Sequence, residues 1–239
     1  MNKERLKTGL EMMGVAADET ALDRFEAFHA ILDEYNARMD LTAVLDEDER
    51  VDRHDLDSAA PLAHGLLVQG AKVIDVGTGA GFPGMPLLIL RPDLQITFLD
   101  ALNKRILFLE DALRRLGLTA VTLHARAEDA AKMAAHREQY DAAVSRAVAN
   151  AATLEELTLP FVKKGGVAIA WKGPGVADEL TAARRAAFLL GGTVRGTVDA
   201  PIPRRADWAH VLLLTDKTGT TPKAYPRKAG TPGKKPLGM

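Results

Sequence analysis

Short apolar runs alternate with helical stretches from residue 71 onward, and this alternation limits the possible folds more than any other feature of the sequence. Five runs predict buried parallel strands, and two more predict a closing pair. Each of the five leaves room for a crossover helix. Taken together, they predict an α/β fold with a Rossmann-like, doubly wound sheet, mostly parallel with an antiparallel closing strand. The seven runs lie at 73–76, 96–100, 121–125, 142–146, 167–172, 193–199 and 209–215.

The clearest crossover helix is 107–118, and Gly117 is a suitable stop for it. Before the strands, residues 20–45 place apolar side chains at intervals of three and four, from Leu22 to Tyr35, which predicts an amphipathic helix. We therefore expect an N-terminal helical cap over 1–65, followed by a Rossmann-like domain over 66–216.

Charged residues cluster in two places. Residues 46–57 hold seven acids and two arginines, and such a run is usually a solvated loop or helix face. After Asp216 the chain has six lysines and arginines and no acid, whereas the net charge of the whole chain is −1. We expect this segment, 217–239, to be a basic tail that packs on or extends from the same domain. Polyanion binding and simple solvation both explain its charge.

Other features limit the classes of function. The chain has no cysteine, which excludes disulfides, thiolate metal sites and cysteine nucleophiles. The six histidines show no ligand spacing with carboxylates, so we expect no metal. No stretch approaches the ~20 apolar residues of a membrane span, and the start lacks the apolar core of a secretory signal. We expect a cytoplasmic monomer that does not bind membranes.

A glycine-rich segment follows the first predicted strand and precedes a helical stretch. It begins at Asp75 and contains Gly77, Gly79 and Gly81. In a doubly wound fold the backbone turns sharply here and a ligand approaches it closely, which favours residues without a Cβ. Asp100 ends the second strand, where an acid accepts hydrogen bonds from ribose hydroxyls. These residues predict a site for a nucleoside-like cofactor.

The glycine spacing distinguishes two cofactor classes. A dinucleotide loop has the pattern G-x-G-x-x-G, but Phe82 occupies the position of the third glycine. The observed G-x-G-x-G after an acid resembles motif I of class I methyltransferases, which use S-adenosylmethionine. Phe82 and Pro83 also suit a diphosphate poorly, whereas a sulfonium cofactor has no phosphate. A nicotinamide-dependent oxidoreductase on the same fold is the alternative.

Longer stretches resemble the ribosomal RNA small subunit methyltransferase G family, also called glucose-inhibited division protein B. They include RHDLDS at 53–58, DVGTGAGFPGMPL at 75–87, DALNKRILFL at 100–109, DAAVSRAVA at 141–149, WKG at 171–173 and YPRKAGTPGKKPL at 225–237. Two positions depart from the common family pattern. Asp40 stands where asparagine usually precedes the LTA motif, and Ala101 stands where serine usually follows the ribose acid.

The resemblance implies methylation of guanine N7 in the 530 loop of 16S ribosomal RNA, with S-adenosylmethionine as the donor. Carried over by motif, Gly77 and Phe82 would contact the cofactor, together with Asp75, Gly79 and Gly81 of the same loop. Asp100 would hold the ribose, Ala127 and Glu128 would border the adenine, and Arg146 would lie beside the methionine end.

The residues near the fourth strand agree with a ring nitrogen as the acceptor. Guanine N7 has a lone pair and no proton to lose, so alignment matters more than a general base. C5 methylation of pyrimidines typically uses a cysteine, and amino methylation often uses an Asn/Asp-Pro-Pro-aromatic segment; the chain has neither feature there. Arg146 is the candidate catalytic residue, as a group that positions the substrate. A structural ion pair with an acid such as Glu128 is the alternative.

The expected partner is 16S ribosomal RNA or the small ribosomal subunit. Lys104 and Arg105 are candidate RNA contacts after the second strand, although a solvated helix start explains them as well. His54 is a weaker candidate, and Trp171 is more often core than a stacking platform. A non-catalytic RNA-binding assembly factor is the second alternative function. The remaining candidate RNA contacts are Lys172, Lys223, Tyr225, Arg227, Lys228, Lys234 and Lys235.

Overall fold

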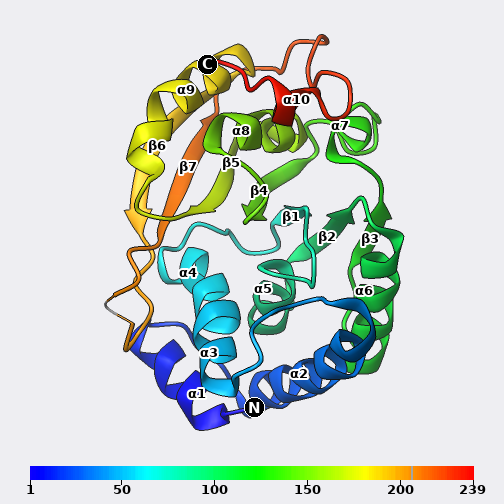
Figure 1. Ribbon diagram of the computed structural model, residues 1–239, viewed down its shortest axis with the longest axis vertical. Coiled ribbons are helices and arrows are strands. Elements are labelled where there is room, and N and C mark those ends of the chain that lie inside the picture. Colours follow the sequence, from blue (N-terminus) through cyan, green and yellow to red (C-terminus); the bar gives the residue numbers. More distant parts are fainter. Residues whose placement is uncertain (206) are drawn as a thin grey trace.

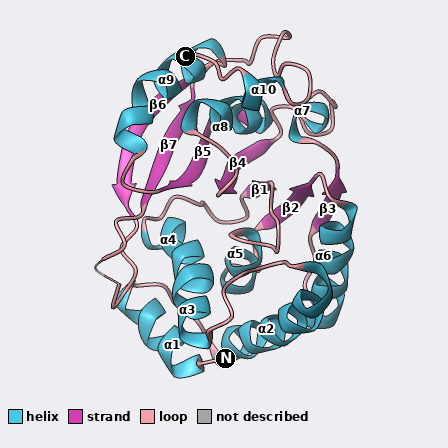
Figure 2. Cartoon of the chain, in the orientation of Figure 1, coloured by secondary structure: helices cyan, strands magenta, loops and turns pink. Residues whose placement is uncertain are grey.

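A computed structural model describes residues 1–205 and 207–239, in which seven strands form one sheet between two layers of helices (Figures 1 and 2). The strand order is β3-β2-β1-β4-β5-β7-β6. Strands β1 to β5 are parallel, and β7 is antiparallel to both β5 and β6. All seven predicted strands are present, at Lys72–Val76, Gln95–Asp100, Val121–His124, Tyr140–Arg146, Val162–Lys172, Gly192–Asp199 and Val211–Lys217. The predicted fold class is confirmed.

Helices α1 to α6 lie on one side of the sheet and α7 to α10 on the other (Figure 1). Successive strand residues face opposite layers: in β4, Ala142 and Val144 belong to the core beside α2, α5 and α6, whereas Ala143 belongs to the core beside α8 and α9. The first layer is α1 (Lys3–Met12), α2 (Glu19–Met39), α3 (Glu47–Arg50), a π-helix (Val51–Leu56), α4 (Asp57–Ala63), α5 (Gly84–Leu90) and α6 (Asn103–Leu116). The second is α7 (Ala127–Ala130), α8 (Ala151–Thr158), a 3-10 turn (Leu159–Phe161), α9 (Val176–Leu189) and α10 (Thr231–Lys234).

Helix ends follow local chemistry. Helix α6 stops at Gly117, which adopts a left-handed φ of 62° as predicted. Helix α2 ends at Met39, after the apolar stripe and before the end of the 20–45 segment, where the side chain of Asn36 hydrogen-bonds to the backbone that follows the helix. Its Oδ1 accepts from the amides of Leu41 and Thr42, and its Nδ2 donates to the Thr42 carbonyl.

The N-terminal helices share a core with the sheet layer. Phe28 of α2 packs edge-on against Phe82 of the glycine loop, with ring centroids 5.6 Å apart, and lies 6.2 Å from Phe108 of α6. Aromatic pairs of this kind contribute about 0.5–1.5 kcal/mol beyond their buried area. The cap therefore fixes one side of the glycine loop.

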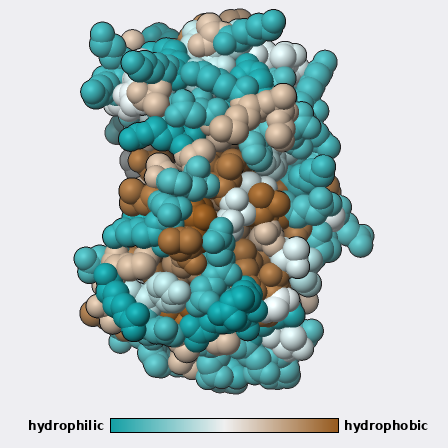
Figure 3. Space-filling view, turned by 90° about the vertical axis from the view of Figure 1, so that its right-hand side faces the viewer, coloured by the Kyte–Doolittle hydropathy of each residue, from teal (hydrophilic) through white to brown (hydrophobic). Residues whose placement is uncertain are grey.

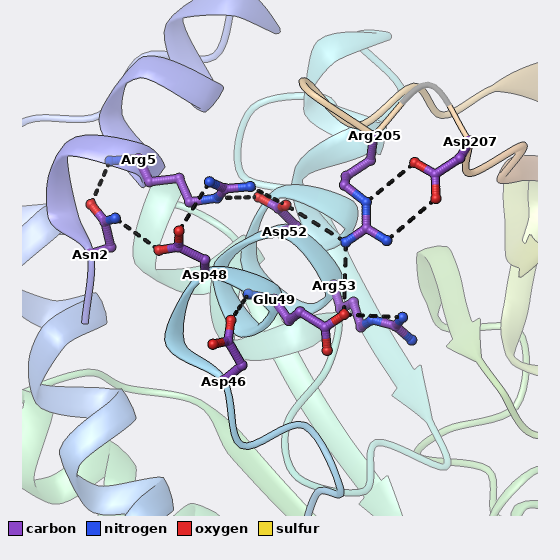
Figure 4. A network of polar contacts seen from close by, with 9 residues as sticks. All are labelled: Asn2, Arg5, Asp46, Asp48, Glu49, Asp52, Arg53, Arg205 and Asp207. Carbon is purple, nitrogen blue, oxygen red and sulfur yellow. Dashed lines mark hydrogen bonds and ion pairs between the residues drawn. The ribbon is translucent and has the colours of Figure 1, made fainter.

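The expectation of a solvated face at 46–57 holds for its first acids, Asp46 and Glu47, and is wrong for its last three. This segment forms α3 and the π-helix, and Asp52, Asp55 and Asp57 are buried. Each of these carboxylates pairs with a side chain from elsewhere in the chain. Such pairing offsets the cost of burying a charge. Figure 4 shows the contacts around Asp52, whose carboxylate lies 2.6 Å from the guanidinium of Arg5 in α1. His29 of α2 approaches Asp55 at 2.8 Å.

The basic segment after Asp216 packs on the second layer of helices. Lys217 is the last residue of β7, and its ammonium is buried 3.1 Å from Glu138. Arg227 forms an ion pair of 2.6 Å with the buried carboxylate of Glu156 in α8. Four of the six cations remain exposed: Lys223, Lys228, Lys234 and Lys235.

Candidate cofactor and acceptor site

Most of the predicted site residues gather where the parallel strands end. Because β1, β2 and β4 are neighbours, their carboxyl ends bring Gly77, Asp100 and Arg146 to the same edge of the sheet. A cavity of about 140 Å³ opens at this edge. Gly77, Asp100, Ala127, Glu128 and the apolar side chain of Val148 contribute to its lining. A largely apolar cleft that also carries carboxylates has the character of a nucleoside site.

The three glycines of the loop adopt backbone conformations that other residues avoid. Their φ angles are +73° at Gly77, +61° at Gly79 and +90° at Gly81. Close packing adds a second reason at two of them: a Cβ would lie 2.8 Å from the Val148 side chain at Gly77, and 2.8 Å from that of Leu109 at Gly81. The loop therefore depends on glycine both for its shape and for its packing.

Asp75 supports the loop from inside the protein. Its Oδ2 accepts hydrogen bonds from the Thr78 hydroxyl at 2.6 Å and from the Gly84 amide at 2.9 Å. Burial raises the pKa of this carboxyl to about 6. Its Oδ1 is buried and has no partner among the described residues. Asp75 thus stabilises the turn and keeps one acceptor free.

Asp100 ties the end of β2 to the glycine loop. One oxygen accepts from the Leu102 amide at 2.8 Å, and the other accepts from the Gly79 amide at 3.0 Å. Arg105 also approaches Asp100, at 3.2 Å, so its charge is partly engaged here. Lys104 donates to the Met39 carbonyl at 3.3 Å from an exposed position.

The Phe82 ring lies near two candidate site residues, His54 and Arg146. The His54 ring stacks on it with centroids 4.4 Å apart, and the Arg146 guanidinium carbon lies 5.4 Å from its ring centroid. Burial, with the nearby Arg146 charge, lowers the pKa of His54 to about 3. His54 is therefore neutral at physiological pH, and its Nε2 lies 2.8 Å from the Thr42 hydroxyl.

Arg146 pairs with Asp57 rather than with Glu128. Its Nη1 donates to Asp57 Oδ2 at 2.8 Å and to the Arg53 carbonyl at 3.0 Å. Glu128 instead accepts from the Gly230 amide at 2.7 Å. Sequence reasoning missed Asp57, although it lies in the RHDLDS stretch quoted above.

The remaining candidates differ in exposure. Trp171 is buried and its Nε1 donates to the Asp57 carbonyl, which agrees with a core role. Lys172 is paired with Glu179 at 2.8 Å and is mostly buried. Tyr225 is half-buried against the second-layer core. Among the tail candidates the four lysines are exposed, whereas Arg227 is partly buried in its ion pair with Glu156.

Figure 3 shows the face on the α6 and β3 side, where apolar residues gather across the middle and the two ends are hydrophilic. In the described ranges no helix is long and apolar enough to cross a bilayer. Within the same ranges, no three His, Asp or Glu side chains come together as a metal site requires.

Comparison with known proteins identifies relatives along nearly the whole chain. A family model described as rRNA small subunit methyltransferase G matches residues 21–204. The chain is 42% identical to Ribosomal RNA small subunit methyltransferase G of Clostridium perfringens, over 97% of each chain. It is 43% identical to the protein of the same name from Alkaliphilus metalliredigens, over 99% of each.

Solved structures with low sequence identity share the fold. A putative sarcosine dimethylglycine methyltransferase from Galdieria sulphuraria matches with a TM-score of 0.56 and 15% identity, over 80% of this chain and 98% of that one. The fibrillarin pre-rRNA processing protein of Methanococcus jannaschii matches with a TM-score of 0.51 and 18% identity, over 68% of this chain and 74% of that one. At these identities the likeness extends to the fold alone.

Proposed function

The chain belongs to the rRNA small subunit methyltransferase G family, and we propose that it transfers a methyl group from S-adenosylmethionine to guanine N7 in the 530 loop of 16S ribosomal RNA. One observation carries the proposal beyond family membership. The glycine loop has a nucleoside-type cleft with Asp100 on one side, and Arg146 beside Phe82 on the other. A donor and an acceptor would therefore meet across this loop.

The residues of the cleft fit the donor. Asp100 would accept hydrogen bonds from the ribose hydroxyls, and Ala127 and Glu128 would border the adenine. The glycines allow close approach of the backbone, and the free Oδ1 of Asp75 offers an acceptor beneath the loop. When bound, S-adenosylmethionine supplies an electrophilic methyl group whose bond to sulfur breaks, with its electron pair left on sulfur, as the N7 lone pair attacks.

The protein's contribution is to orient the guanine. Both hydrogen bonds that Arg146 makes within the described part of the chain use Nη1, which leaves Nη2 and Nε available to the guanine O6. Arginine commonly recognises this edge of guanine. No proton leaves N7, so the neutral His54 has no proton to accept, and alignment supplies the rate.

We further propose that the protein acts in the cytoplasm as a monomer.

Transfer of isotopically labelled methyl groups to unmethylated small subunits and to their stripped RNA tests this function. We expect label in 7-methylguanosine after nucleoside analysis. Label in another nucleoside would overturn the proposed target atom. Cofactor binding without any transfer would instead favour a binding-only assembly factor.

Asp100→Asn should weaken cofactor binding about tenfold, because the amide accepts hydrogen bonds without a negative charge and charge-assisted bonds contribute about 1.5–3 kcal/mol. Thermal shift at increasing concentrations of S-adenosylmethionine measures the affinity, since a ligand of the folded state raises Tm. NAD serves as the control ligand and should leave Tm unchanged. Stabilisation by NAD and not by S-adenosylmethionine would point to the oxidoreductase alternative.

Replacing Lys223, Lys228, Lys234 and Lys235 together by glutamine should weaken RNA binding and reduce its salt dependence. These lysines are exposed, and each phosphate contact to single-stranded RNA contributes about 0.7 to the slope of log K against log salt. The slope should fall by up to about 3 while cofactor affinity stays constant. The matched control changes Lys72, Lys132, Lys163 and Lys164, which are also exposed and carry the same charge. Equal losses in both variants would show that only total charge matters.

A further inference from the structure

Asp57 lies where the cap meets three strands of the sheet. It begins α4, and its carboxylate is shared by two side chains from distant parts of the chain. Oδ2 accepts from Arg146 at the end of β4, and Oδ1 lies 3.1 Å from Nδ1 of His210, just before β7. Its backbone carbonyl accepts from Trp171 of β5 at 2.9 Å. The Asp57 side chain is only 3% exposed, so these contacts are largely shielded from water.

We propose that Asp57 is a positioning residue for methyl transfer, which holds the Arg146 guanidinium beside Phe82, and that His210 supports Asp57 from the other side. The inference rests on the proposed function, because it assigns Arg146 to the acceptor guanine. It adds two residues that do not line the cofactor cleft.

Geometry supports this role. A long arginine side chain has many rotamers, and fixing it before the substrate arrives lowers the entropy lost in the transition state. Asp57 and the Arg53 carbonyl together accept both hydrogen bonds of Arg146 Nη1. Because His210 occupies the second oxygen of Asp57, the carboxylate is itself held in one orientation. A precise site requires that the residue which holds a functional side chain is itself held in place, as Asp57 is by His210.

Charge gives a second reason. Methylation at N7 leaves a positive charge on the guanine ring, and an unpaired guanidinium beside it would oppose that charge. The Asp57 carboxylate, 2.8 Å from Arg146, offsets the guanidinium charge. Arg146 can then donate hydrogen bonds to the guanine with less electrostatic opposition to the product.

The connection between β6 and β7 keeps His210 in place. The Trp208 ring stacks on His210 with centroids 5.6 Å apart, and the guanidinium of Arg53 lies 4.5 Å from the Trp208 ring centroid. Figure 4 shows Arg205 of the same connection reaching Asp52 and Glu49, each at 4.0 Å. The connection is thus tied to α3 and to the π-helix immediately before Asp57.

Asp57→Asn tests the proposal directly. The single-turnover rate at saturating cofactor and RNA should fall about tenfold, which is within the range of coupling between contacting residues, and the Kd for S-adenosylmethionine should stay within about twofold. Glu156→Gln is the matched control, because it also removes a buried carboxylate from an ion pair with an arginine, Arg227, and it lies in α8 on the other side of the sheet. It should keep the wild-type rate, even if both variants melt at lower temperature.

A double-mutant cycle separates positioning from general destabilisation. It uses His210, which is half-exposed and whose replacement leaves Asp57 paired with Arg146. His210→Gln should slow transfer about threefold, and it should have no further effect in an Arg146→Gln background. Wild-type rates in His210→Gln, or additive effects in the double variant, would overturn the inference even if Asp57→Asn fails to fold. Absence of transfer by the wild-type protein would overturn the proposed function instead, so the two failures are distinguishable.

Discussion

Arg146→Gln is expected to reduce the single-turnover rate of methyl transfer on the order of 100-fold, the loss typical of a misaligned reacting group. Glutamine retains hydrogen-bond donors but is shorter, so it cannot reach both Asp57 and a guanine beside Phe82. The affinity for S-adenosylmethionine should fall far less, because Arg146 is not part of the cofactor cleft lining. Rapid-quench assays with labelled donor measure the rate, and thermal shift measures the affinity.

Arg5→Gln is the matched control for this variant. Arg5 also pairs with a buried aspartate, Asp52, but it lies in α1, away from the glycine loop. The Arg5→Gln variant should therefore unfold more easily and keep the wild-type rate of methyl transfer per folded molecule. A loss of cofactor affinity as large as the loss of rate would mean that Arg146 acts through the methionine end of the donor and not through the guanine.

Local features of the fold were predictable from sequence because the signals themselves are local. The strands are continuous apolar runs, and the glycine loop is ten consecutive residues beside one of them. Gly117 ends α6 through its own backbone conformation. Each of these depends on neighbours in the chain, so no knowledge of the folded protein is needed to recognise it.

Long-range pairing is what the sequence pattern could not reveal. Asp57 and Arg146 are 89 residues apart, and Asp57 and His210 are 153 apart. Within 46–57 the density of acids indicates solvation, since composition does not show that Arg5, His29 and Arg146 come to meet them. The paired state of Arg105, Lys172 and Arg227 was hidden for the same reason.

The tail illustrates the difference most clearly. Charge alone is explained equally by a polyanion-binding arm and by a solvated tail, and removal of either would spare the fold. In the structure, truncation after Asp216 also removes one partner from each of two ion pairs that have a buried member. Glu156 would lose Arg227, and Glu138 would lose Lys217. Leaving one member of a buried ion pair alone costs about 3–5 kcal/mol, a large share of the ~5–15 kcal/mol that stabilises a typical domain.

We therefore expect the truncated chain to melt at least about 6 °C lower than the full chain, at about 2–4 °C per kcal/mol for a protein of this size, or to be insoluble. Differential scanning calorimetry measures the change, and the four-lysine variant is the comparison, because it removes exposed tail charges and keeps every buried pair. That variant should melt like the full chain. If the truncated chain does so too and loses only RNA affinity, Arg227 and Lys217 contribute little to the fold, and the tail is an appended arm after all.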